Sequence, residues 1–229
     1  MNATVTPVNA TVTPLKAPPG AGLLHLVVFR PPVEDAAPVC PLMQALDELE
    51  AARAATFVHD RDRRQYVAAH ATLRRVLAEY TGHEPSRVPL GRAEGPYGKP
   101  QLIGSPVPLH FNLSHSHGLI AIGVAADPVG VDVQRVPSPE AVEVVLPRLH
   151  PREREELRAL PASERPEAFA RLWTRKEAYL KGLGTGLTRS PAADYLGETA
   201  AARPAGWTVR NVPVQPGYAA AAALRHHPT

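Results

Sequence analysis

Apolar residues recur at every second position, or in short continuous runs, in six parts of the chain. Alternation of this kind predicts strands, because successive side chains of a strand point to opposite faces. The middle of the chain holds three such segments, and the dipeptide Asp127-Pro128 predicts a tight turn between the last two. The six expected strands are 22–29, 110–116, 117–126, 129–136, 206–214 and 217–224.

Apolar residues spaced three and four apart predict helices between these strands. The strongest signal covers 60–82, where Gly82 marks the end of the helix. The other expected helices are 41–56, 151–160 and 163–184. Each half of the chain therefore offers a leading strand region, helices and further strands. We expect an α+β protein of two similar subdomains, an N-terminal one over 21–109 and a C-terminal one over 110–229.

Residues 2–8 and 9–15 form a short tandem repeat, NATVTPV followed by NATVTPL. With the Pro- and Gly-rich residues that follow, it predicts a disordered leader over 1–20. This start has neither the charged region nor the apolar region of a secretory signal.

Composition narrows the class of protein. The net charge is +3 and the sequence pI is near 9.2, which is mildly basic and gives no indication of a nucleic-acid partner. The single cysteine, Cys40, excludes an intramolecular disulfide framework and favours a reducing compartment. No apolar run approaches the roughly 20 residues of a membrane span. We expect a soluble cytoplasmic protein without a membrane partner.

Asp132 interrupts an apolar strand, in VGVDVQRV at 129–136. It shares one strand face with Gln134, while Val131 and Val133 take the other face. A buried carboxylate is costly unless it is paired, hydrogen-bonded or bound to a metal. Two interpretations stay open from this segment alone: a satisfied structural aspartate, or a ligand.

Trp173, Glu177 and Lys181 lie four apart and share one stripe of the expected helix over 163–184. Glu177 and Lys181 alone would suit a surface ion pair worth about 0.3–0.5 kcal/mol. The tryptophan on the same stripe indicates a partly buried face. A carboxylate and an amine beside it favour the wall of a site.

Two further segments carry candidate groups. His115 and His117 have the spacing of a metal pair, but the sequence shows no third ligand at useful spacing, which disfavours zinc. Ser114 and His115 are adjacent and face opposite ways on a strand, which disfavours a Ser–His dyad. Lys99 lies in YGKP, which is not a phosphate-binding P-loop but presents one ammonium. Together, hard oxygen ligands and cations indicate Mg²⁺ and phosphoryl-group chemistry on a diphosphate ester.

The order and spacing of four motifs resemble the 4′-phosphopantetheinyl transferases, in their two-subdomain Sfp type. The resemblance covers roughly residues 40–190, and the W-x-x-K-E-A-x-x-K pattern is its most specific part. The motifs are GKP (98–100), FNLSHS (111–116), VGVDVQ (129–134) and LWTRKEAYLKGLGTGL (172–187).

The resemblance implies a monomeric enzyme with pseudo-twofold symmetry and its active site in the cleft between the subdomains. Such enzymes transfer phosphopantetheine from coenzyme A to a serine of an apo acyl, peptidyl or polyketide carrier protein and release adenosine 3′,5′-bisphosphate. By position, Asp132 and Glu177 resemble the Mg²⁺ ligands of the family. Glu177 would also be the general base, and Lys181 and His115 would stabilise charge on the transferred phosphoryl group. The residues that the resemblance assigns to coenzyme A are Arg53, Arg64, Arg92, Lys99, Asn112, Ser114, His115 and Lys181.

Gln134 departs from the commonest pattern of the family, in which a second acid stands two residues after the first. A glutamine carbonyl brings no charge, so we expect two firm protein ligands, with Gln134 weak, water-mediated or absent. Two other classes of function remain as rivals: a coenzyme A-binding regulatory module without catalysis, and a Mg²⁺-dependent phosphodiesterase that hydrolyses coenzyme A.

Overall fold

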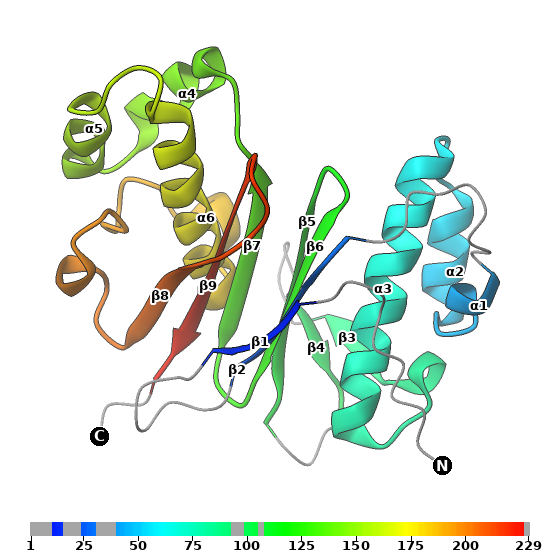
Figure 1. Ribbon diagram of the computed structural model, residues 1–229. Coiled ribbons are helices and arrows are strands. Elements are labelled where there is room, and N and C mark those ends of the chain that lie inside the picture. Colours follow the sequence, from blue (N-terminus) through cyan, green and yellow to red (C-terminus); the bar gives the residue numbers. More distant parts are fainter. Residues whose placement is uncertain (1–10, 16–23, 31–39, 93–98, 105–107, 227–229) are drawn as a thin grey trace.

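The computed structural model describes residues 11–15, 24–30, 40–92, 99–104 and 108–226. The two larger antiparallel sheets of this structure lie side by side, with helices on the outside of each (Figure 1). The layers therefore run helix, sheet, sheet, helix. The coarse expectation of a mixed helix and strand protein is confirmed.

The first sheet has four strands in the order β1-β2-β6-β5. Its strands are β1 (Thr11–Leu15), β2 (Leu24–Phe29), β5 (His110–Ser116) and β6 (Leu119–Ala125). A two-residue turn joins β5 to β6, and both of its residues have positive φ, 45° at His117 and 85° at Gly118. Turns of this kind match the twist of the strands that they connect. A separate pair of short strands, β3 (Leu90–Arg92) and β4 (Pro100–Leu102), completes this half.

The second sheet has three strands in the order β7-β9-β8. Its strands are β7 (Val129–Arg135), β8 (Trp207–Val212) and β9 (Tyr218–Arg225). The β7 strand is an edge strand of this sheet, and it lies next to β5, the edge strand of the first. Two sheet edges thus meet in the middle of the molecule.

Each sheet buries its outer face under a long helix. The helix α3 (Asp60–Thr81) packs on the first sheet through Ala69, Leu73 and Leu77, and it ends at Gly82 with φ 71°. The helix α6 (Arg165–Leu183) packs on the second sheet through Ala178 and neighbouring apolar residues. The remaining helices are α1 (Cys40–Met43), α2 (Glu48–Ala55), α4 (Pro139–Val145) and α5 (Pro151–Arg158), with short 3₁₀ turns at Pro85–Arg87, Leu146–Arg148, Gly186–Thr188 and Ala200–Ala202.

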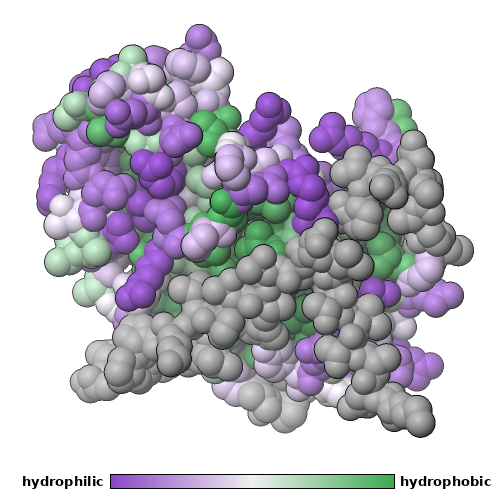
Figure 2. Space-filling model, viewed as in Figure 1, coloured by the Kyte–Doolittle hydropathy of each residue, from purple (hydrophilic) through white to green (hydrophobic). Residues whose placement is uncertain are grey.

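A third apolar cluster lies between the sheets. In β6, Leu119 and Ala121 face the second sheet, whereas Ile120 and Ile122 face α3. All seven residues of β6 are buried, which explains why its sequence is apolar on both faces. In the view of Figure 1, hydrophobic residues are visible where the sheets meet, beside the more hydrophilic surface of α4, α5 and α6 (Figure 2).

Four features differ from the expectations. Residues 11–15 form β1, paired antiparallel with β2, where the sequence predicts disorder; the β-branched residues of Thr-Val-Thr suit an edge strand. The other residues of the expected leader lie outside the described ranges. The expected helix 41–56 is two helices, because Asp47 accepts a hydrogen bond from the Glu50 amide and starts α2 with a capping box. The strands β3 and β4 and the helix α4 are not among the expected elements.

The fourth difference concerns the boundary between the two halves. The sequence places it between residues 109 and 110, but β5 and β6 form hydrogen bonds within the first sheet, next to β2. The chain crosses to the second sheet between Ala125 and Val129, at the Asp127-Pro128 turn. No helix among the described residues is long and apolar enough to cross a membrane.

Candidate active site

Asp132 lies in the middle of β7 and is 1% exposed. It stands opposite Ala221 of β9 and shares the face that packs on α6. Its neighbours Val131 and Val133 point the other way, into the apolar cluster between the sheets. The alternation read from the sequence therefore gives the correct faces of this strand.

Two glycines let α6 approach β7 closely. A Cβ atom on Gly130 would lie 2.0 Å from the carbonyl oxygen of Ala178 and 2.4 Å from the amide nitrogen of Gly182. A Cβ atom on Gly182 would meet the Trp207 ring at 2.6 Å. Backbone lies almost against backbone at this point. Glu177 and Lys181, which directly precede Ala178 and Gly182, are thereby held near Asp132.

Three elements meet at one oxygen of Asp132. The Lys181 ammonium, from α6, donates to Asp132 Oδ1 at 2.6 Å, and the Ser114 hydroxyl, from β5, donates to the same atom at 2.8 Å. Lys181 Nζ also donates to Ser114 Oγ at 3.0 Å. The second oxygen, Asp132 Oδ2, is buried and accepts no hydrogen bond from the described residues. A buried carboxylate oxygen in this state is costly unless a cation or a donor binds it.

Glu177 lies one helical turn before Lys181 and faces the same place. Burial raises the pKa of Glu177, the Asp132 carboxylate raises it further, and the Lys181 ammonium opposes both effects. The interaction indicates that the two carboxylates are close enough to repel each other. Trp173, on the same stripe, is half-buried and stacks on Phe169 with ring centroids 5.8 Å apart. The expectation of a partly buried stripe is met at these positions.

The donor set fits a hard divalent cation. Two carboxylates with one buried unbonded oxygen suit Mg²⁺, which takes few protein ligands and keeps waters. No cluster of three or more His, Cys, Asp or Glu side chains that could hold a metal occurs in the described part of the chain. Gln134 follows on the same strand face and is half-buried.

Side chains of β5 bind the open edge of β7. Asn112 Oδ1 accepts a hydrogen bond from the Val131 amide at 2.9 Å, Ser114 Oγ accepts one from the Val133 amide at 3.3 Å, and Ser116 Oγ accepts one from the Arg135 amide at 3.2 Å. Alternate side chains of one strand thus replace the backbone acceptors of a neighbouring strand. These bonds join the two sheets directly beside Asp132.

His115 points away from Ser114, as the sequence predicts, and its Nδ1 lies 2.9 Å from Gln65 Nε2 of α3. Burial lowers the pKa of His115, and His70 and Lys181 lower it further. The imidazole borders a pocket of about 460 Å³ between the start of α3 and the β5–β6 turn. The pocket is lined by Phe57, Arg61, Asp62, Gln65, Tyr66, His115, Ser116 and His117.

The remaining candidates from the sequence lie around these groups. Lys99 donates to the Val129 carbonyl at 2.8 Å, at the start of β7, and burial lowers its pKa to about 8. The exposed Arg53 lies over the ring of Phe57, a lining residue of the pocket, and Arg64 pairs with Asp60 at 3.6 Å. Arg92 ends β3, and its side chain lies outside the described atoms.

Sequence reasoning missed the α3 side of the pocket. Arg61 and Gln65 are four apart, as are Asp62 and Tyr66, so each pair shares a helix face. That spacing was available in the sequence. Without a partner surface, however, the polar start of a helix has the appearance of an ordinary solvated face.

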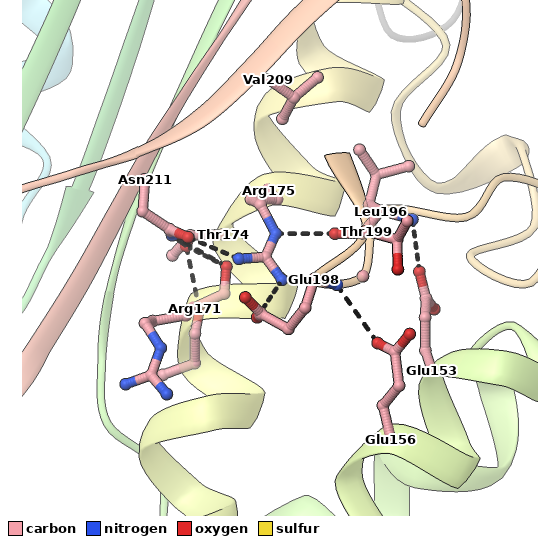
Figure 3. Close-up of polar contacts among 12 residues, drawn as sticks. Glu153, Glu156, Arg171, Thr174, Arg175, Leu196, Glu198, Thr199, Val209 and Asn211 are labelled. Carbon is pink, nitrogen blue, oxygen red and sulfur yellow. Dashed lines mark hydrogen bonds and ion pairs between the residues drawn. The ribbon is translucent and has the colours of Figure 1, made fainter. Parts of the chain in front are cut away.

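A buried polar network supports α6 on the side away from the site (Figure 3). Arg175 is 2% exposed and donates to the Leu196 carbonyl, to Asn211 Oδ1 and to Glu198 Oε1, at 2.7, 2.6 and 2.9 Å. Lys176 is 3% exposed and pairs with Glu153, which is 0% exposed, at 2.8 Å. Arg175 and Lys176 lie within the W-x-x-K-E-A-x-x-K segment, and their buried bonds therefore hold the helix that carries Glu177 and Lys181.

Comparison with known proteins agrees with this picture. Residues 128–210 match the family model of the 4′-phosphopantetheinyl transferase superfamily, a range that includes β7, α6 and both candidate carboxylates. The chain is similar to the 4′-phosphopantetheinyl transferase HetI of Nostoc sp. (strain PCC 7120), with 36% identity over 65% of this chain and 63% of that protein. It is also similar to a 4′-phosphopantetheinyl transferase of Bacillus subtilis, with 28% identity over 64% of each chain.

A further relative is the Sfp enzyme of Bacillus subtilis (strain 168), with 27% identity over 58% of this chain and 57% of that protein. The chain therefore covers less than two thirds of the length of these relatives. These matches agree with the resemblance that its motifs show to the 4′-phosphopantetheinyl transferases.

Proposed function

We propose that this protein transfers the 4′-phosphopantetheine group from coenzyme A to a serine of an apo acyl, peptidyl or polyketide carrier protein, with Mg²⁺, and releases adenosine 3′,5′-bisphosphate. The observation that carries the proposal is the cluster formed by Asp132, Glu177 and Lys181. A buried carboxylate with one unbonded oxygen, a second carboxylate of raised pKa and a lysine ammonium lie together. This combination of charges suits a metal-bound pyrophosphate.

Asp132 and Glu177 are the proposed metal ligands. Bound there, Mg²⁺ would supply charge neutralisation for the pyrophosphate oxygens and the departing bisphosphate. Gln134 is proposed as a weak or water-mediated neighbour, because it brings no charge. A direct bond from Gln134 Oε1 at about 2.1 Å in a Mg²⁺–coenzyme A complex would contradict this assignment.

Coenzyme A is proposed to lie with its nucleotide end towards the pocket beside His115. Gln65 and Tyr66 line that pocket, and Arg53 lies next to its Phe57 wall. A neutral imidazole with a lowered pKa can donate one ring N–H to a phosphate oxygen. The other proposed phosphate and coenzyme A contacts are Arg64, Arg92, Lys99, Asn112 and Lys181. The resemblance also assigns Ser114 to coenzyme A, but its hydroxyl is bonded to Asp132, Lys181 and the Val133 amide.

Glu177 is the proposed general base. Its raised pKa makes it a stronger base than an exposed glutamate, so it can accept the proton of the carrier serine hydroxyl. The serine oxygen forms its bond to the β-phosphorus as the bond from that phosphorus to the bridging oxygen breaks. The Lys181 ammonium and the His115 ring stabilise the negative charge that grows on the transferred phosphoryl group.

We also propose the finer features of the expected fold. The two helix-and-sheet halves would be related by a pseudo-twofold axis, with the site in the cleft between them. A monomer would then contain the complete site. The single cysteine supports a location in the reducing cytoplasm.

The test is intact-mass spectrometry of an apo carrier protein incubated with coenzyme A, Mg²⁺ and the enzyme. We expect the carrier to gain one phosphopantetheine with the wild-type protein and with Glu167→Ala, but not with Glu177→Ala. Glu167 is a matched control, because it is an exposed glutamate of the same helix, ten residues earlier. Intact coenzyme A without transfer to several carriers would favour a binding module, and its hydrolysis without a carrier would favour a phosphodiesterase.

A further inference from the structure

Ser114 occupies an unusual position among the candidate residues, because its hydroxyl touches three groups from two other elements. It is 6% exposed and lies on β5, in the first sheet. Its Oγ lies 2.8 Å from Asp132 Oδ1, 3.0 Å from Lys181 Nζ and 3.3 Å from the Val133 amide nitrogen. Asp132 and Val133 belong to the second sheet, and Lys181 belongs to α6.

The hydrogen-bonding capacity of a hydroxyl fixes the direction of these three contacts. A serine hydroxyl has one donor and two acceptor positions. The Val133 amide and the Lys181 ammonium can only donate, so they take both acceptor positions. The single hydroxyl proton is therefore directed at Asp132 Oδ1. All the hydrogen-bonding capacity of Ser114 is used inside the protein.

The two oxygens of Asp132 are consequently unequal. Oδ1 receives the Ser114 hydroxyl and the Lys181 ammonium, whereas Oδ2 is buried and accepts nothing from the described residues. A carboxylate held on one side in this way cannot rotate freely about its Cβ–Cγ bond.

We propose that Ser114 is a positioning residue of the metal site: its hydroxyl holds Asp132 Oδ1 and so reserves Oδ2 for the divalent cation. Outer groups that orient a ligating carboxylate are a general feature of metal sites. If Lys181 turns towards a phosphate of the substrate, the Ser114 hydroxyl still holds Oδ1. This inference rests on the proposed metal-dependent function, and it differs from a role for Ser114 as a direct coenzyme A contact.

The test compares two affinities of the same variant. The intact protein is titrated with Mn²⁺ while free Mn²⁺ is followed by electron paramagnetic resonance. The titration is made with the protein alone and then with coenzyme A, against a protein-free blank. Ser114→Ala is expected to weaken Mn²⁺ binding by about 10- to 100-fold. Its affinity for coenzyme A in EDTA, measured by calorimetry, is expected to remain that of the wild type.

Ser116→Ala is the matched control for the metal titration. Ser116 lies on the same face of β5 and also accepts a hydrogen bond from a β7 amide, that of Arg135, but it does not touch Asp132. In the titration without coenzyme A, it should keep the Mn²⁺ affinity while losing a similar bridging bond. If Ser114→Ala does not fold, Ser114→Cys replaces it, because a thiol of similar size is only a weak donor and should also weaken Mn²⁺ binding.

The outcomes separate the inference from the function on which it rests. The positioning role is overturned if Ser114→Ala keeps the wild-type Mn²⁺ affinity, whether or not its coenzyme A binding in EDTA is weaker. The transferase proposal still stands after that result. Absence of Mn²⁺ binding to the wild-type protein under both conditions refutes the metal site itself, and the inference with it.

Discussion

The close approach of α6 to β7 leads to a sharp prediction about Gly130. In Gly130→Ala, the new Cβ atom would lie 2.0 Å from the Ala178 carbonyl oxygen, whereas real Cβ contacts are essentially never shorter than 3.0 Å. To lengthen this contact from 2.0 Å to 3.0 Å, α6 must move away from β7 by about 1 Å. Both clashing groups belong to backbone, so no side-chain rotation can relieve the contact.

Two effects are expected, one on stability and one on activity. Overpacking of this kind costs about 1–3 kcal/mol of unfolding free energy, measured by urea denaturation. The same movement carries Glu177 and Lys181 away from Asp132. A misplacement of about 1 Å in a catalytic group lowers the rate by about 100-fold. The activity of Gly130→Ala, measured as carrier phosphopantetheinylation under conditions where the variant is fully folded, should therefore fall by about 100-fold.

Leu77→Ala separates the loss of activity from the loss of stability. Leu77 is 0% exposed at the far end of α3, and its removal should cost about 2–5 kcal/mol without moving α6. We expect this variant to keep its activity at temperatures where it is folded. Wild-type activity in Gly130→Ala, or an equal loss of activity in Leu77→Ala, would refute the positioning argument.

Three further predictions concern charged groups. Glu177→Gln should unfold at a higher temperature than the wild type at neutral pH without metal. The folded-state pKa of Glu177 is raised, so the wild type loses stability as pH rises from the unfolded pKa of about 4.5 through the folded pKa. The melting temperatures of the two proteins should therefore converge below pH 4, and a constant difference at all pH values would count against this reasoning. Lys181→Met leaves the Asp132 carboxylate without its ammonium and should lower the free energy of unfolding by about 3 kcal/mol, the low end for a broken buried pair because Lys181 is 27% exposed. Added Mn²⁺ should restore part of the lost melting temperature, and no response to the metal would contradict the metal site. Burial lowers the pKa of Lys99 to about 8, so the affinity for coenzyme A should fall as pH rises through 8. Lys99→Met should flatten this pH dependence, and an unchanged pH profile in the variant would exclude Lys99 as a phosphate contact.

The sequence by itself determined the local parts of the site. Alternation predicted β5 and β7 within one residue of their ends and assigned Asp132 and Val131 to opposite faces. The four-residue spacing placed Glu177 and Lys181 on one stripe of α6. These properties depend on backbone periods of about 2 and 3.6 residues, which are fixed within a single element.

Only the tertiary structure decided how these elements meet. Asp132 and Lys181 are 49 residues apart, and Ser114 is 18 residues from Asp132, so no local period relates them. Their contact depends on the close packing at Gly130 and on side chains of β5 that bind the open edge of β7. The pairing of β1 and the sheet to which β5 and β6 belong were also decided there. Those choices depend on which edges and apolar faces remain uncovered after the whole chain has packed, and a local pattern carries no record of them.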